Sequence, residues 1–251
     1  MSAPVFVSAD AADAAVGSAL TLAGAEARHA LAVQRRAVGE VIDLVDGAGA
    51  RARARIVSVH DGILEARVEH VSRDDDPRVT LVQALAKGGR DEQAVEAATE
   101  LGITGVVPWA AERSIVQWRG AKAEKALAQW RSLALAAAKQ SRRALIPQVD
   151  PMVTSRQLAE AIGTATAEGV RVLVLHESAG TALASLTWAD DSEPVWIIVG
   201  PEGGITDAEL AGFTAAGAVS VRLGVHVLRA SSAGPAAIAA LATARGTWAT
   251  A

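Results

Sequence analysis

The chain has 251 residues, a formal net charge of −4 and no cysteine. This length has room for one large or two modest domains. The lack of cysteine excludes disulfides, thiolate metal sites and a cysteine nucleophile, and the five histidines are too widely spaced to predict a metal centre. The net negative charge argues against indiscriminate nucleic-acid binding by the whole molecule. Any nucleic-acid binding would therefore depend on local basic patches. No apolar run approaches the ~18 residues of a membrane span and no secretory signal is evident, so we expect no membrane partner and a cytoplasmic location.

The first 72 residues have the pattern of a small β-barrel. Short apolar stretches bounded by turn residues predict strands at 5–7, 19–22, 41–45, 52–59 and 64–71. Asp46-Gly47 and Asp61-Gly62 are typical of hairpin turns. One helix, predicted at 24–40, interrupts the strands. The charged, proline-containing run at 73–77 predicts a linker.

Two basic stretches stand out, "RARAR" at 51–55 and "KQSRR" at 139–143. In the first, Arg51, Arg53 and Arg55 occupy one face of a strand, because side chains there repeat every second residue. We expect that face to be solvated and positive. It is either a nucleic-acid-binding surface or the ordinary polar face of an antiparallel sheet.

From residue 78 to 251 the pattern changes to alternating strands and helices. The predicted strands are 79–85, 103–107, 170–175, 195–199 and 219–223, and the predicted helices are 91–101, 121–142, 206–216 and 232–246. Such alternation is typical of an α/β domain, in which helices cover both faces of a parallel sheet.

The stretch "VGPEGGITDAEL" at 199–210 is a glycine-rich turn between a strand and a helix. Thr206 and Glu209 have the spacing of a capping box, which predicts the helix start. Ligands of parallel α/β folds bind at the carboxyl ends of strands. Two other predicted strands end in His176-Glu177 and Leu223-Gly224, so we expect one pocket to collect all three ends. The glycine spacing matches neither G-x-G-x-x-G nor a phosphate loop.

These motifs together resemble the 16S ribosomal RNA uridine-N3 methyltransferases of the SPOUT superfamily. They run in order along nearly the whole chain as "RHALAVQRR", "KGGR", "ATELGI", "ERSIV", "KQSRRALIP", "LHE", "VGPEGGITDAEL" and "LGVHVLR". The resemblance implies an N-terminal PUA-like β-barrel and a C-terminal α/β domain with a deep trefoil knot. It also implies a homodimer, S-adenosylmethionine as methyl donor, and 16S ribosomal RNA or the small ribosomal subunit as partner.

The resemblance further implies the site residues. The cofactor pocket would comprise Leu175, Gly200, Pro201, Gly203, Gly204, Leu223, Gly224 and Leu228. Arg229 is the candidate catalytic residue, because positive charge beside the uracil carbonyls favours loss of the N3 proton. Alternatively, Arg229 pairs with Glu202 or holds an RNA phosphate. Glu202 is expected either to take part in proton removal or to cap a nearby helix. No metal is implied.

RNA contacts are expected from basic residues of both domains. Phosphate contacts are assigned to Arg28, Arg35, Arg36, Arg51, Arg53, Arg55 and Arg143, while Lys87, Arg90 and Arg113 line the approach of an extruded base. His29 either stacks on a base or is a surface helix residue.

The sequence departs from the family pattern at two positions. Ser231 stands where the family usually has a glutamate, which leaves the proton acceptor unassigned. Lys139 stands where an acidic residue is common, and we interpret it as a solvent-facing helix residue. Two other functions stay open. A non-catalytic ribosomal-RNA-binding module would explain Ser231, and a small-molecule nucleotide-binding enzyme would not depend on the arginines of the first domain.

Overall fold

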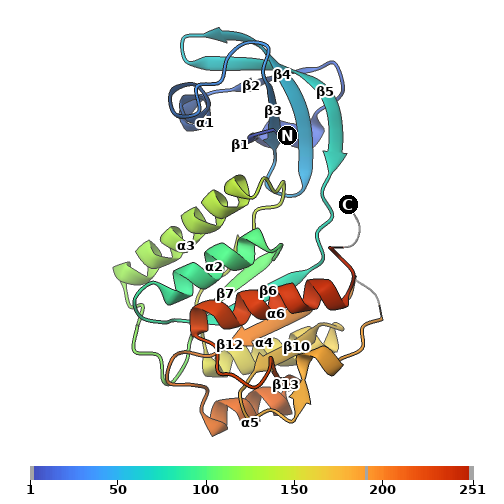
Figure 1. Ribbon diagram of the computed structural model, residues 1–251. Helices are drawn as coiled ribbons and strands as arrows, with labels where there is room; N and C mark the ends of the chain where they lie inside the picture. Colours follow the sequence, from blue (N-terminus) through green and yellow to red (C-terminus); the bar gives the residue numbers. More distant parts are fainter. Residues whose placement is uncertain (1–2, 190–191, 249–251) are drawn as a thin grey trace. The chain divides into compact units, whose positions relative to one another are not determined.

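The computed structural model describes residues 3–189 and 192–248, which group into two compact units (Figure 1). The first unit comprises the chain up to Asp75 together with Leu135–Ile146. The second unit comprises Asp76–Ala134 and the chain from Pro147 onward. The sequence-based division placed 135–146 in the second domain, whereas the contacts group this segment with the first unit.

The first unit contains a five-stranded sheet. Its strands are β1 (Val5–Val7), β2 (Ala19–Leu22), β3 (Val41–Val45), β4 (Ala50–His60) and β5 (Ile63–Arg73), in the order β1-β3-β4-β5-β2. The β1–β3 pair is parallel and the other pairs are antiparallel. All five predicted strands are present, and a 3-10 helix follows β1 at Ala9–Asp13.

Side-chain alternation along β4 builds the core of the first unit. Ala52, Ala54 and Ile56 are buried against Phe6 and Leu44, while the intervening arginines point outward. The β4–β5 hairpin turns at Asp61-Gly62, as predicted. Both turn residues have positive φ, 51° and 76°, which suits the twist of a two-residue hairpin.

The helix predicted at 24–40 is much shorter. It consists of α1 (Gly24–Arg28) and a π-helical turn at His29–Val33. The π-type bond from the Gln34 N–H to the His29 carbonyl, 2.9 Å, widens the helix, and Arg35 then has a φ of 55°. A left-handed residue cannot continue a right-handed helix, so the chain leaves the helix there.

The second unit is built on one parallel sheet, as predicted. Its strands are β6 (Val79–Ala84), β7 (Gly105–Ala110), β8 (Gln148–Val149), β10 (Arg171–Leu175), β11 (Thr181–Ala182), β12 (Val195–Val199) and β13 (Val219–Arg222), in the order β11-β13-β10-β12-β6-β7-β8. The short strand β9 (Val153–Thr154) pairs with β7. Strands β8, β9 and β11 were not predicted, because two residues carry no periodic pattern.

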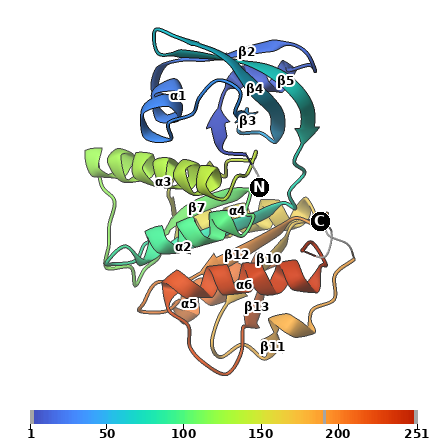
Figure 2. The same ribbon diagram turned by 45° about the horizontal axis from the view of Figure 1, so that its top comes forward.

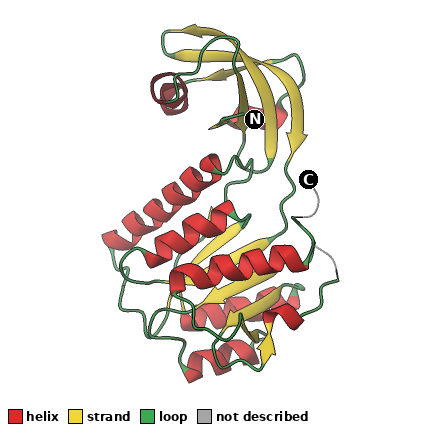
Figure 3. Cartoon of the chain, in the orientation of Figure 1, coloured by secondary structure: helices red, strands yellow, loops and turns green. Residues whose placement is uncertain are grey.

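Helices cover both faces of this sheet, as Figures 2 and 3 show. One face is covered by α2 (Arg90–Glu100), α3 (Ala121–Gln140) and α6 (Ala230–Ala244), and the other by α4 (Ser155–Ala167) and α5 (Asp207–Ala215). Neighbouring strand residues such as Ile197 and Ile198 are buried on opposite faces. This explains the continuous apolar runs in the strands.

Helix α4 was missed by the sequence analysis, although it begins with a capping box. Thr154 accepts the N–H of Gln157, and the Gln157 side chain accepts the N–H of Thr154. This spacing was a usable signal. No helix in 3–189 or 192–248 is long and apolar enough to cross a membrane.

Candidate functional site

The carboxyl ends of β13, β10 and β12, which are adjacent in the sheet, open into a cavity of about 640 Å³. Its lining comes from the ends of all three strands, as expected: Leu175, His176 and Glu177 after β10, Val199 to Ile205 after β12, and Val227 to Ala230 after β13. A smaller cavity of about 80 Å³ shares several of these residues and adds Leu223 and Gly224. Every residue predicted for the cofactor pocket lies in one of the two. The larger volume is within the range of small-molecule sites.

The glycine turn after β12 requires glycine for two different reasons. A Cβ atom at Gly200 would lie 2.7 Å from Cγ1 of Ile205, and Gly204 has a φ of 75°. The turn is closed by a 2.9 Å bond from the Gly204 N–H to the Pro201 carbonyl. Helix α5 then begins with the predicted capping box of Thr206 and Glu209. The backbone of the turn therefore lies directly at the cavity wall.

Glu209 supports this turn more extensively than a capping residue needs to. Its buried carboxylate also accepts the Glu112 N–H at 2.8 Å and the Ser155 hydroxyl at 2.6 Å. Burial opposes ionisation, but these bonds and those from Thr206 outweigh it, so the pKa of Glu209 lies below its ordinary value. Glu209 thus joins the chain after β7 to the start of α5. The capping pattern indicated only part of this role.

Glu202 is held by the "KGGR" segment at the start of α2. Its Oε1 accepts Nη1 of Arg90 at 2.7 Å and the N–H of Lys87 at 3.1 Å. Burial raises the pKa of Glu202, but its own backbone N–H, Arg90 and Lys87 outweigh that effect, so the pKa is lowered. A carboxylate with a lowered pKa and two donors is a poor proton acceptor. These contacts favour a positioning role for Glu202.

Two further contacts fix the segments around Glu202. Nη1 of Arg113 donates to the Gly203 carbonyl at 3.1 Å. Asp91, which is buried, accepts the Ala86 N–H at 3.0 Å, and burial raises the pKa of its carboxyl. The sequence analysis did not single out Asp91. The only sequence feature that could have indicated a role for Asp91 is its position as an acidic residue in the first turn of a predicted helix.

Arg229 is the N-cap residue of α6, and its exposed side chain lines the cavity. Within the described part of the chain, no carboxylate lies within ion-pair distance of its guanidinium, and Glu202 pairs with Arg90 instead. The expected alternative of an Arg229–Glu202 pair is therefore not present. Ser231 is half-buried and lines neither cavity, whereas Ala230 and Ala233 line the larger one.

The "RARAR" face differs from the expectation of a positive surface. Arg51 pairs with Asp74 and, at 3.1 Å, with Asp43. Arg53 also binds Asp43, at 3.0 Å, and Arg55 binds Glu69 at 2.6 Å. The three arginines do share one face of β4, but carboxylates that are distant in sequence neutralise them. The prediction of a positive face was therefore wrong.

The other predicted RNA contacts of the first unit vary in accessibility. Arg28 and Arg35 are exposed, Arg36 pairs with Glu40 at 3.3 Å, and Arg143 is buried. His29 is half-buried: its ring lies 6.0 Å from that of Phe6 and 3.0 Å from the Gln34 amide nitrogen.

Lys139 was predicted to face solvent, and this prediction was wrong. Its Nζ binds both carboxylate oxygens of Glu26, at 2.7 and 2.9 Å, and its side chain is 16% exposed. Glu26 also accepts the Val7 N–H at 2.9 Å. Lys139 therefore joins α3 to α1. Its partner is far away in sequence and gave no local signal.

No group of three or more His, Asp or Glu side chains suited to a metal occurs among residues 3–189 and 192–248. Three arginines, Arg90, Arg113 and Arg229, and three carboxylates, Glu177, Glu202 and Asp207, line the cavity, so their formal charges balance. Arg90 pairs with Glu202, whereas the guanidinium of Arg229 is available to stabilise negative charge that develops in a reaction.

Comparisons with known proteins agree with this geometry. The model of the RNA methyltransferase domain family matches residues 74–242. The ribosomal RNA small subunit methyltransferase E of Mycobacterium bovis is 41% identical over 92% of this chain and 89% of its own. The Neisseria gonorrhoeae enzyme of the same name, bound to S-adenosyl methionine, has a TM-score of 0.83 and 31% identity, covering 96% of this chain and 98% of its own.

A methyltransferase structure from Legionella pneumophila, in complex with the cofactor SAM, has a TM-score of 0.81 and 26% identity. It covers 97% of this chain and 98% of its own. The matches thus extend over both units and over the three strand ends that form the cavity. This chain belongs to the RNA methyltransferase domain family, as a relative of the ribosomal RNA small subunit methyltransferases E.

Proposed function

We propose that this chain transfers the methyl group of S-adenosylmethionine to N3 of a uridine in 16S ribosomal RNA, with the small ribosomal subunit as substrate. The coarser activity, S-adenosylmethionine-dependent methylation of ribosomal RNA, follows from the family and from its cofactor-bound members. The observation that carries the proposal is the cavity itself. A glycine turn, apolar side chains and the exposed Arg229 share its wall.

The residues at the cavity suit S-adenosylmethionine. Leu175 and Leu228 offer apolar surface for an adenine ring, and the turn from Gly200 to Gly204 offers backbone polar groups without obstructing side chains. Leu223 and Gly224 extend this surface into the smaller cavity. When bound, the cofactor supplies an electrophilic methyl group on a positively charged sulfur. The chain's contribution is to bind it, orient it and exclude water.

Arg229 is proposed to act on the uracil. Loss of the N3 proton to solvent leaves negative charge on the two carbonyl oxygens of the ring. A guanidinium that is always charged and already lies at the cavity stabilises that charge without rearrangement. Glu202 is proposed to position the "KGGR" segment, with Arg90 and Arg113 near the entering nucleotide. Uracil must leave any base pair to expose N3.

The PUA-like barrel, the deep trefoil knot and the homodimer are also part of the proposal. The five-stranded sheet of the first unit supports the barrel, and the order of the motifs along the chain supports the knot. Val225 and Val227, beside the cavities, are 91% and 77% exposed. Exposed apolar side chains next to a binding site are typical of surfaces that another chain covers. Light scattering of the purified protein tests the dimer.

The proposed function is tested with unmodified small ribosomal subunits and labelled S-adenosylmethionine. Digestion of the RNA and mass spectrometry should show 3-methyluridine with the wild-type protein and at least a ~100-fold lower rate with Arg229→Ala, because charge stabilisation at such a position is worth several kcal/mol. Absence of any methylated nucleoside, although cofactor and subunit both bind, would refute the proposal. It would favour the non-catalytic RNA-binding module instead.

One feature of the sequence favours that module, the serine at position 231. The structure weakens the argument, because Ser231 lines neither cavity while its neighbours Ala230 and Ala233 do. The absence of a carboxylate at this position therefore removes no group from the described cavity wall.

A further inference from the structure

The first unit holds two arginines in a backbone conformation that arginine rarely adopts. Among the described residues, positive φ outside glycine occurs at Arg35 (55°), Asp61 (51°) and Arg142 (62°). Aspartate is common in this region, and Asp61 lies in a hairpin turn that requires it. Arginine does not favour positive φ, so the residue type does not explain the conformation of Arg35 and Arg142. Both are exposed.

The conformation of Arg35 is imposed by the residues around it. The N–H groups of Gln34 and Arg36 donate to the carbonyls of His29 and Ala30, each at 2.9 Å. The Gln34 amide nitrogen also lies 3.0 Å from Nε2 of His29. The backbone is thus fixed on both sides of Arg35. His29, expected either to stack on a base or to be a surface helix residue, helps to anchor the turn that presents Arg35.

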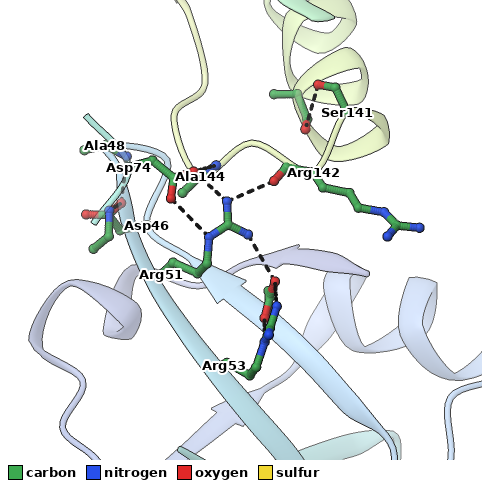
Figure 4. A network of polar contacts seen from close by, with 11 residues as sticks. Asp46, Ala48, Arg51, Arg53, Asp74, Ser141, Arg142 and Ala144 are labelled. Atoms are coloured by element: carbon green, nitrogen blue, oxygen red, sulfur yellow. Dashed lines mark hydrogen bonds and ion pairs between the residues drawn. The ribbon is translucent and has the colours of Figure 1, made fainter. Parts of the chain in front are cut away.

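The backbone at Arg142 is held by a different set of contacts, a polar network shown in Figure 4. Nη2 of Arg51 donates to the Arg142 carbonyl at 2.9 Å, and Asp74 accepts the Ala144 N–H at 3.0 Å. Asp74 and the nearly inaccessible Asp43 hold the Arg51 guanidinium in place. The Arg142 side chain extends away from this network in the view of Figure 4.

The two segments that carry these arginines are joined directly. Lys139, three residues before Arg142, binds Glu26 of α1 at 2.7 Å, and α1 leads into the turn at Arg35. The Lys139 side chain is 16% exposed, so this link is shielded from solvent. The two cations therefore belong to connected parts of one unit.

We propose that Arg35 and Arg142 are phosphate contacts that the first unit makes with RNA, and that Arg51 positions Arg142 and does not itself bind RNA. This inference rests on the proposed function. A non-glycine residue in a left-handed conformation is costly, and such strain persists where the surroundings over-determine it, typically at functional sites. Glycine would occupy either position without strain. What arginine adds there is an accessible charge suited to phosphate.

Glycine substitutions separate this role from a structural one. Arg35→Gly and Arg142→Gly remove the charge and relieve the backbone, so we expect an unchanged or higher melting temperature. Affinity for unmodified small ribosomal subunits should fall roughly three- to tenfold for each variant, and the slope of log affinity against log salt should fall by about 1. Asp61→Gly is the matched control. It relieves the same conformation without removing a cation, so RNA affinity should not decrease.

A double-mutant cycle tests the positioning role of Arg51. Arg51→Ala should weaken subunit binding in the wild-type background and have little further effect on binding in the Arg142→Gly background. Equal losses in both backgrounds would show that Arg51 does not act through Arg142. Wild-type affinity and salt dependence in the two glycine variants would overturn the inference. A wild-type protein that neither binds nor methylates the subunits would instead refute the proposed function.

Discussion

Replacing Glu202 with glutamine distinguishes a positioning residue from a proton acceptor. Glutamine has nearly the same shape and keeps an oxygen that can accept the Lys87 N–H, now at 3.1 Å. It loses the charge opposite Arg90, whose Nη1 lies 2.7 Å from Oε1 of Glu202. The substitution therefore removes basicity and one ion pair while it preserves the local backbone contact.

The expected cost in stability follows from the exposure of the pair. The side chains of Arg90 and Glu202 are 30% and 23% exposed, so solvent screens their attraction. Such pairs contribute about 0.5–1 kcal/mol. Glu202→Gln should thus lower the melting temperature by a few degrees at most. Glu202→Ala also loses the bond to Lys87, for about 2 kcal/mol in total.

The kinetic result follows from the positioning role. The KM for cofactor or subunit should rise several-fold in Glu202→Gln, while kcat stays within about threefold of the wild type. The folded-state pKa of Glu202 is lowered. Its stabilising contribution is therefore present above the unfolded value of about 4.3 and is lost as the pH falls through the lower folded value.

Because the pKa of Glu202 is lowered, Glu202 titrates below the pH range of the assay. Between about pH 6 and 9 the carboxylate stays ionised, so the pH–rate profile of Glu202→Gln should keep the wild-type shape. Steady-state rates over this range, with both substrates varied, measure this. A fall in kcat of about 1,000-fold, with loss of a limb of the profile, would refute the positioning role and identify Glu202 as the proton acceptor.

Four further substitutions test the polar networks by denaturant unfolding. Glu209→Ala leaves the Glu112 N–H and the Ser155 hydroxyl without their acceptor and should cost about 2–4 kcal/mol. Because the pKa of Glu209 is lowered, its contribution is lost as the pH falls below about 4.3, and Glu209→Gln should flatten that acid limb. Asp43→Ala leaves Arg51 without one of its carboxylates in a buried setting and should cost about 3 kcal/mol. Arg55→Ala removes an exposed ion pair and should cost less than about 1 kcal/mol. Equal costs for Asp43→Ala and Arg55→Ala would contradict the expectation that the buried pair contributes more.

The parallel sheet and the cavity could be predicted because their signals are local. A strand buried on both faces is apolar throughout, and a glycine turn followed by Thr206 and Glu209 marks both a strand end and a helix start. The pocket then followed from a general property of parallel sheets. The strands that end in His176, in the glycine turn and in Leu223 are in fact neighbours.

The polar partners could not be predicted in the same way. Periodicity identifies the face on which a side chain lies and says nothing of which residues from elsewhere reach that face. Arg51 binds Asp74, 23 positions away, and Lys139 binds Glu26, 113 positions away. The unit to which 135–146 belongs depends on such long-range contacts. The contact between Glu202 and Arg90 could not be predicted for the same reason, because 112 positions separate them in the sequence.

These partners change what the arginines of the first unit can contribute to RNA binding. An arginine that neutralises a phosphate releases a condensed counterion, and this release gives the salt dependence. Arg53 and Arg55 already have protein carboxylates as counterions, at 3.0 and 2.6 Å. They gain less from a phosphate, because they must first give up that partner.

The difference can be measured with two single variants. Arg55→Gln should leave the salt slope of subunit binding nearly unchanged, whereas Arg35→Gly should reduce it by about 1. The two variants remove the same number of positive charges, so net charge alone predicts equal slopes. Equal slopes would mean that the number of arginines governs RNA binding. Unequal slopes in the expected direction would mean that their intramolecular partners govern it.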